Sequence, residues 1–174
     1  MHANYKQKMK ISPEVNNILD FALEEAMRTG CYGIGPDHFF LGLLRDGDNE
    51  AFARLKKFGI DTEAAKEDVE DTIFQAQGIP YGHEDSVYLS REGENLMSLS
   101  FAEALKSGED ELTSLHLMRA LLREDHCEAC SYLRRSGLKA DQFLGQKKES
   151  KPAVAPTPID YSVLFSFANS EITS

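Results

Sequence analysis

The sequence predicts an all-α fold of two tandem four-helix repeats packed about a pseudo-twofold axis. First, the segment at residues 35–45 returns in weaker form at residues 113–123, a shift of 78 residues that carries His38 onto His116. Second, helix caps, apolar stripes and stop residues recur at the same offset without a gap. Third, the turns between the predicted helices are very short. Recurrence at one fixed offset is the mark of a repeat architecture.

The first repeat covers about residues 11–77 and opens with a helix whose ends are well marked. Ser12 is a good N-cap, Pro13 is tolerated at the first helical position, and Gly30 suits the left-handed residue after a helix. Residues 31–34 are expected to be a short connection. The predicted buried stripe of this helix consists of Val15, Ile18, Leu19, Ala22, Leu23 and Ala26.

Three more helices are predicted to complete the first repeat. The second begins at Gly35-Pro36-Asp37, the third stops at Gly59, and the fourth occupies about residues 61–77. Their expected buried side chains are Phe39, Phe40, Leu43, Leu44, Phe52, Leu55, Phe58, Ala65, Val69, Ile73 and Phe74.

The second repeat is predicted at about residues 89–146, after a loop at residues 78–85 that is rich in turn formers. Ser90 takes the place of Ser12, and Gly108 takes the place of Gly30. Its fourth helix, at about residues 140–146, is expected to be cut short. The two repeats together make a predicted domain at residues 1–146.

Residues 147–174 differ in character from the repeats and are predicted to be a linker and a tail. Residues 147–158 contain three prolines among Lys, Ser, Ala and Thr, which is typical of an extended linker. Residues 159–167 alternate apolar and polar side chains, the pattern of a strand with one buried face. This tail either docks on a groove or another copy, or is disordered and without function.

The composition is that of a soluble globular protein with an acidic surface. The formal net charge is -10, which disfavours nucleic acid as a partner because phosphates are repelled. No apolar run is long enough for a membrane span, and the basic amino terminus lacks the apolar segment of a signal peptide. Three cysteines without framework spacing indicate a reducing compartment, so the cytoplasm is expected.

Two clusters could carry chemistry, but a structural role is the better interpretation of each. His38 and His116 recur at one repeat position with no nucleophile nearby to orient, so they are expected to pack between helices. Cys127 and Cys130 have Cys-x-x-Cys spacing, which suits redox chemistry or zinc. There is no second cysteine pair and the predicted context is all helical, so no metal or other cofactor is expected.

The repeat motif resembles the amino-terminal domain of Clp-family AAA+ unfoldases, with the ClpA and ClpC types most similar. The resemblance covers about residues 11–146 and is carried by Gly35-Pro36-Asp37-His38 and the apolar helix that follows. It implies a non-catalytic module that binds substrate proteins or adaptors for an ATP-driven Clp ring. The chain has no Gly-x-x-x-x-Gly-Lys-Ser/Thr loop for a nucleotide, so we expect a stand-alone relative or the amino-terminal piece of a longer protein.

The resemblance also implies a possible phosphoarginine site. In ClpC-type members an acidic residue of the repeat motif receives the guanidinium group beside a helix amino terminus. Asp37 occupies that position in the first repeat, but Leu115 occupies it in the second, so at most one site is expected. Pro36 removes one N–H donor from that turn. Tyr81 and Tyr88, in or beside the loop between the repeats, are expected to line a groove there.

Two other functions are kept as alternatives to the binding module. The first is a regulator or decoy that competes with a true Clp domain for adaptors, or that docks on the ring through residues 159–167. The second is a thiol oxidoreductase that uses Cys127 and Cys130, which is the weaker alternative because the cysteines lie in a helical context.

Overall fold

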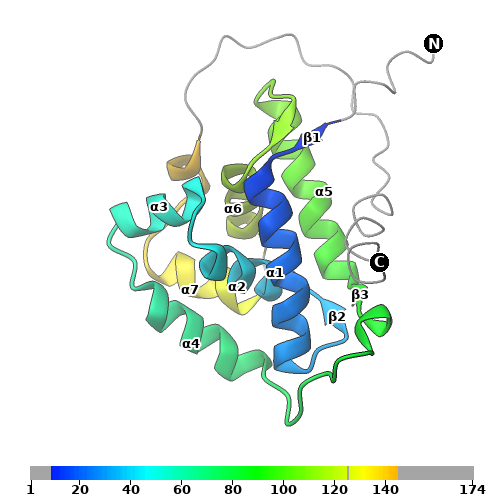
Figure 1. Ribbon diagram of the computed structural model, residues 1–174. Helices are drawn as coiled ribbons and strands as arrows, with labels where there is room; N and C mark the ends of the chain where they lie inside the picture. The colour runs from blue at the N-terminus through cyan, green and yellow to red at the C-terminus, as the bar shows by residue number, and fades with distance from the viewer. Residues whose placement is uncertain (1–8, 125, 145–174) are drawn as a thin grey trace, which may run out of the picture.

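The computed structural model describes residues 9–124 and 126–144, and helices dominate this part of the chain (Figure 1). The α-helices are α1 (Pro13–Thr29), α2 (Pro36–Asp46), α3 (Glu50–Lys57), α4 (Thr62–Ile73), α5 (Arg91–Lys106), α6 (Ser114–Arg123) and α7 (Glu128–Arg135). The shorter elements are the 3-10 helices η2 (Glu84–Ser86) and η3 (Ala140–Phe143) and the strands β1 (Lys10–Ile11), β2 (Gly33–Ile34), β3 (Tyr88–Leu89) and β4 (Glu111–Leu112). The predicted all-α class is confirmed, while the predicted linker and tail at residues 147–174 lie outside the described ranges.

The predicted ends of α1 are confirmed by its hydrogen bonds. The Ser12 hydroxyl accepts from the Val15 N–H at 3.3 Å, and Pro13 is the first helical residue. Gly30 has φ 82°, and its N–H donates to carbonyls of the last turn. An L side chain is strained at that angle, so glycine is needed where α1 ends.

Two predicted helices are shorter than expected. The helix expected to reach Gln77 ends at Ile73, because the chain then turns back to α1, where the Gln75 N–H donates to the Thr29 carbonyl at 2.8 Å. Carbonyls in the last turn of a helix have no partner within it, and this return supplies one. The fourth helix expected at residues 140–146 is only a 3-10 turn over its described part, η3.

The connection expected at residues 31–34 contains a strand, and the strands join the two repeats in a crossed arrangement. β1 pairs in parallel with β4, and β2 pairs in parallel with β3. The Ser12 N–H donates to the Leu112 carbonyl at 3.0 Å, and the Ser90 N–H donates to the Ile34 carbonyl at 3.1 Å. These two bonds are related by the 78-residue offset. Each of the two ladders therefore contains one strand from each repeat.

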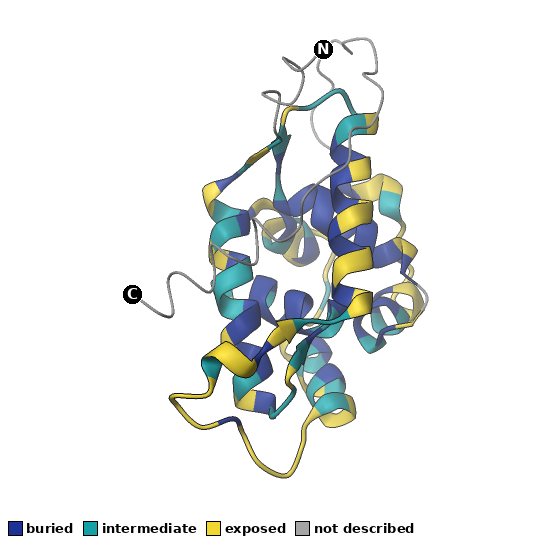
Figure 2. Ribbon diagram, turned by 90° about the vertical axis from the view of Figure 1, so that its right-hand side faces the viewer, coloured by how far each residue is buried: buried dark blue, intermediate teal, exposed yellow. Residues whose placement is uncertain are grey.

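The core is continuous across both repeats, and buried residues line the inward side of every long helix (Figure 2). Gly42 allows α2 to pack closely on α1, since a Cβ there would lie 2.7 Å from the Ile18 carbonyl oxygen. Beyond the direct helix pairs, α4 packs against α7 of the other repeat, and η3 packs against α6. None of the helices in the described part combines the length and hydropathy needed to cross a bilayer.

The largest fully buried side chain is a charged one, Arg119 on α6. Its guanidinium donates to Glu103 at 3.0 Å, to the Ser107 hydroxyl at 2.9 Å and to the Phe143 carbonyl at 2.9 Å. The last bond fixes η3 against α6. In the first repeat the same position is Leu41, so this buried ion pair is found in one repeat only. Removing one partner of such a pair leaves an uncompensated buried charge, which is strongly destabilising.

The two repeat histidines are buried, as expected, and each also caps the start of a helix. His38 Nδ1 accepts from the Gly35 N–H at 3.0 Å, and His116 Nδ1 accepts from the Thr113 N–H at 2.9 Å. The second nitrogen of His38 lies 3.2 Å from the Thr29 hydroxyl. Burial lowers the pKa of His38 from 6.5 to about 4 and also lowers the pKa of His116. Both rings therefore act as neutral acceptors at the start of their helices.

The free energy of unfolding is expected to fall as the pH drops from 6.5 towards 4. The reason is that His38 has a pKa of 6.5 in the unfolded chain but about 4 in the folded one, so protons bind to the unfolded chain first. The contribution is full above pH 6.5 and decreases by about 3 kcal/mol when the pH reaches 4. Urea unfolding at several pH values measures the slope. The His38→Asn variant keeps an acceptor without the titration, so its slope should be shallower; equal slopes would contradict this assignment.

Candidate functional site

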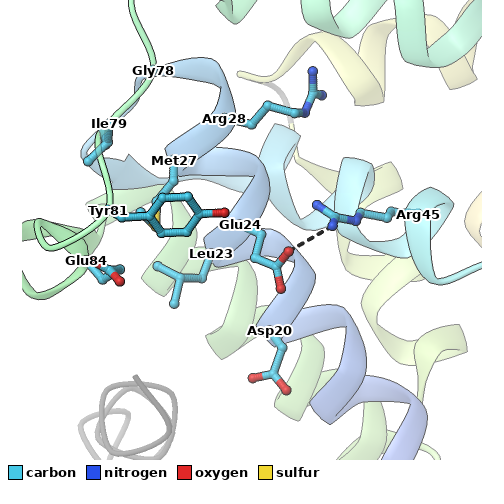
Figure 3. Close-up of a pocket in the computed structure, with 10 residues that line it drawn as sticks. All are labelled: Asp20, Leu23, Glu24, Met27, Arg28, Arg45, Gly78, Ile79, Tyr81 and Glu84. Carbon is cyan, nitrogen blue, oxygen red and sulfur yellow. Dashed lines mark hydrogen bonds and ion pairs between the residues drawn. The ribbon is translucent and has the colours of Figure 1, made fainter. Parts of the chain in front are cut away.

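A groove of about 740 Å³ runs along α1 beside the loop that connects the repeats (Figure 3). Five of its side chains come from one stripe of α1, at spacings of three and four residues that bring them onto one helix face. The lining consists of Asp20, Leu23, Glu24, Met27, Arg28, Arg45, Gly78, Ile79, Tyr81 and Glu84.

The loop wall of the groove is held by backbone hydrogen bonds to the end of α1. The Ile79 N–H donates to the Met27 carbonyl at 2.8 Å, and the Gln75 N–H donates to the Thr29 carbonyl at 2.8 Å. A Cβ at Gly78 would lie 3.2 Å from the Met27 carbonyl oxygen, so the loop comes close to α1. The loop wall of the groove is therefore fixed to the end of α1.

Apolar side chains form part of the groove, and one of them is almost fully open to solvent. Leu23 is buried and Met27 is partly buried, while the Tyr81 side chain is 94% exposed. In the groove Tyr81 comes from the loop, while Leu23 and Met27 come from α1 (Figure 3). An exposed aromatic ring and a methionine thioether in one groove offer a surface that adapts to apolar side chains of different shape.

Both cations of the groove are paired with carboxylates. Arg28 donates to Glu25 at 2.6 Å and also contacts Glu70, while Arg45 donates to Glu24 at 2.8 Å and to Glu25 at 3.0 Å. Burial by itself would raise the pKa of Glu25, but the hydrogen bonds and charges of the two arginines hold it below its ordinary value. Glu25 therefore stays ionised, and the two guanidinium groups share three carboxylates.

Of the two tyrosines predicted to line a groove, Tyr81 does so and Tyr88 is not among the lining residues. Tyr88 lies on β3, and its ring covers Gly33 of β2, where an added Cβ would lie 3.5 Å from the ring. Tyr88 nevertheless remains 55% exposed.

The acidic side chains of the lining are not predicted by the sequence. Asp20 and Glu24 are four residues apart on α1, and Glu84 lies in the loop that packs beside them. Carboxylates spaced by four residues on one helix face are a detectable signal, but nothing in the sequence pairs that face with the loop. Leu23 is buried, as its place in the α1 stripe predicts, and it also lines the groove.

Gly35, Pro36 and Asp37 lie at the start of α2, away from the groove lining, and Asp37 caps a helix of the other repeat. Its two carboxylate oxygens accept from the Ala129 N–H at 2.8 Å and the Glu128 N–H at 3.3 Å, both at the start of α7. Burial raises the pKa of Asp37, and these N–H donors counteract the rise in part. The carboxylate therefore joins the repeats.

The equivalent junction on the other side of the molecule uses different atoms. Ser114, at the repeat position of Pro36, accepts from the Ala51 N–H at 3.0 Å at the start of α3. Glu14 accepts from the Glu50 N–H at 3.2 Å and from the Ser114 N–H at 2.8 Å. Pro36 has no N–H to offer such a carboxylate. The pseudo-twofold relation thus holds for the role of the junction but not for the residues that fill it.

The two cysteines of the Cys-x-x-Cys motif lie at the start of α7 and are buried. The Cys127 sulfur accepts from the Cys130 N–H at 3.3 Å and so caps the helix. Its hydrogen bond with the Cys130 side chain, together with burial, raises the pKa of the Cys127 thiol well above its ordinary value. A protonated, buried thiol is a poor nucleophile. Among the described residues, no group of three His, Cys, Asp or Glu side chains is arranged to hold a metal ion.

Comparison with known proteins places residues 10–144 in the family described as the Clp repeat (R) N-terminal domain. ClpC/MecB of Bacillus subtilis, described as a negative regulator of genetic competence, and the chaperone protein ClpB of Oceanobacillus iheyensis are both 27% identical over 133 residues. In each case the match covers 76% of this chain but only 16% of the relative.

A similar fold is found in solved structures. The N-terminal domain of the ClpV1 ATPase from E. coli superimposes with a TM-score of 0.61 at 19% identity, over 82% of this chain and 86% of that one. A chain from a malarial protein secretion system gives a TM-score of 0.64, also at 19% identity, over 77% and 89% of the two chains. At this level of identity the likeness concerns the fold.

Replacing Asp37 by alanine is expected to lower the free energy of unfolding by about 1–2 kcal/mol, because two N–H groups of α7 lose their acceptor. Asp37→Asn keeps one oxygen and should lose less. The exposed Asp71 on α4 provides the control, and Asp71→Ala should change stability by less than about 0.5 kcal/mol. Urea unfolding compares the three variants, and unchanged stability in Asp37→Ala would contradict the capping role.

Proposed function

The chain belongs to the family of Clp repeat N-terminal domains, and from this membership we propose that it is a protein-binding module. It captures segments of substrate proteins or adaptors for a Clp-type ATP-dependent unfoldase, in the cytoplasm, and performs no catalysis itself. The chain spans only 16% of the length of the curated relatives it matches, so its association with an ATPase ring is part of this proposal.

The observation that carries the proposal is the groove along α1. It combines apolar side chains with charged ones and is open at Tyr81, which is 94% exposed. A tyrosine that remains outside the core offers a large apolar area to an incoming chain, and such residues are enriched at protein interfaces. The volume of about 740 Å³ is sufficient for several side chains of an extended segment.

The buried histidines and Cys127 are the groups best suited to catalysis, but each of them already caps a helix. This favours a binding role over an enzymatic one. The two buried histidines accept from backbone N–H groups at helix starts, and Cys127 caps α7 with a thiol whose pKa is raised. A general base must reach a substrate proton, and a nucleophilic cysteine must reach the thiolate form. The thiol oxidoreductase alternative is therefore not favoured.

A test of segment capture uses a fluorescein-labelled decapeptide with Leu and Phe among Ser and Gly, followed by fluorescence anisotropy. Tyr81→Ala should raise its Kd about three- to tenfold, because a stacked or edge-on aromatic contact contributes about 0.5–1.5 kcal/mol. Tyr81→Phe should bind nearly as the natural chain does.

Tyr88→Ala is the matched control, since Tyr88 is also exposed but is not among the groove-lining residues. Its Kd should equal that of the unchanged chain. Equal weakening by Tyr81→Ala and Tyr88→Ala would assign binding to another surface, and no binding by any variant would remove the proposal. Affinity capture with a Clp ATPase ring then tests the larger partner.

Phosphoarginine binding at Asp37 is a separate prediction of the family resemblance. A guanidinium group there would have to displace the N–H groups of Glu128 and Ala129 from the carboxylate. We therefore expect little heat when free phosphoarginine is titrated into the protein in a calorimeter. Heat that disappears in Asp37→Ala and persists in Asp71→Ala would show instead that Asp37 exchanges its internal partners for the ligand.

A further inference from the structure

One wall of the groove is the loop that carries Tyr81, and this loop begins where α4 ends. The loop passes the last turn of α1 and is fixed there by two backbone hydrogen bonds, to the Thr29 and Met27 carbonyls. Both of these bonds require that the end of α4 lies against α1. The place of Tyr81 therefore depends on what holds the two helices together at that end.

Arg28, in the last turn of α1, is a side chain that holds the end of α4. Its guanidinium donates to both carboxylate oxygens of Glu25, at 2.6 Å and 3.1 Å, and to Glu70 in the last turn of α4. The guanidinium carbon also lies 5.8 Å from the ring centroid of Phe74, the residue that follows α4. A planar guanidinium can bind a carboxylate with two N–H groups and stack on an aromatic ring, whereas a lysine is a point charge. Arg28 thus joins α1, α4 and the start of the loop.

The contact is fixed on its α1 side by a buried carboxylate. Glu25 is buried, and it also accepts from Arg45 of α2 at 3.0 Å. A buried charge is stable only when it is paired and hydrogen-bonded, so Glu25 has to keep its two arginines. Glu25 therefore orients Arg28, and the remaining N–H groups of Arg28 are available to α4.

The second repeat makes a corresponding contact with a different arginine. Glu103 is the counterpart of Glu25 at the 78-residue offset, and it is also buried. It binds Arg119, which donates to the Phe143 carbonyl in η3, the segment that takes the place of α4. In the first repeat Arg28 makes the corresponding link to α4. In both repeats an arginine on the buried glutamate thus holds the fourth helical segment, although the two arginines are not at equivalent positions.

We propose that Arg28 is a positioning residue of the groove: through Glu70 and Phe74 it holds the end of α4 on α1 and so keeps Tyr81 in place for an incoming segment. This inference rests on the proposed function, because it names a residue that prepares the binding surface. Arg28 itself lines the groove, so a direct contact with the segment is the competing explanation. Glu70 and Phe74 are not among the lining residues, and this difference separates the two explanations.

The first test uses the fluorescein-labelled decapeptide with Leu and Phe. Arg28→Gln and Glu70→Ala should each raise its Kd about two- to fivefold, without exceeding the loss in Tyr81→Ala. Arg28→Lys should lie between Arg28→Gln and the natural chain, because one ammonium cannot replace the whole fork. The matched control is Glu67→Ala, at an exposed position on α4, which should leave the Kd unchanged. Urea unfolding shows that each variant is folded under the conditions of the assay.

A double-variant comparison shows through which residue Arg28 acts. In the Tyr81→Ala background, Arg28→Gln should change the Kd by less than about 1.5-fold, because the contact that Arg28 prepares is already absent. A direct contact between Arg28 and the segment would give the same loss in both backgrounds and would leave Glu70→Ala unchanged. That result would overturn the inference and keep segment capture intact.

A second measurement needs no ligand. The chain contains no tryptophan, so Tyr81→Trp places a single fluorescent probe in the loop. In this chain Arg28→Gln should increase the part of the fluorescence anisotropy that decays within nanoseconds, the timescale of loop motion, while Glu67→Ala should not. An unchanged decay in Arg28→Gln would also overturn the inference. If no variant binds the peptide, the proposed function fails, and the decay alone then decides whether Arg28 holds the loop.

Discussion

The crossed backbone hydrogen bonds between the repeats are the constraint on which the rest of the structure depends. Each ladder has only two residues per strand, and an isolated pair of that length is not stable in water. The ladders are stable because β1 and β3 lead directly into α1 and α5, and the apolar stripes of these two helices are buried in one common core. Because every strand pairs with a strand of the other repeat, neither repeat is expected to keep its geometry alone.

The groove is a consequence of that junction. The loop between the repeats has to leave α4, pass the end of α1 and enter β3, which is already paired with β2. On its way it supplies N–H donors to the last carbonyls of α1, at Met27 and Thr29. These bonds satisfy groups that would otherwise lack a partner, and they also set Ile79 and Tyr81 beside the α1 stripe. The same backbone hydrogen bonds thus complete the end of α1 and form one wall of the groove.

The two repeats have diverged where their junctions and cores meet. Asp37 caps α7 from the first repeat, whereas Ser114 and Glu14 share the equivalent task at α3. Likewise Arg119 is buried and fixes η3, whereas its counterpart Leu41 is an ordinary core residue. Such differences keep the overall symmetry while they give each face its own chemistry.

The sequence by itself determined the class, the repeat, the caps of α1 and the buried role of the histidines, because these follow from local patterns of 3.6-residue spacing and from residue preferences at helix ends. Only the tertiary structure decided the rest. The strands, the early end of α4 and the use of Asp37 as a cap all depend on partners from about 45 to 100 residues away, which a local pattern does not encode. The same is true of the groove, since its α1 wall and its loop wall lie far apart in the sequence and come together only when the loop packs on α1.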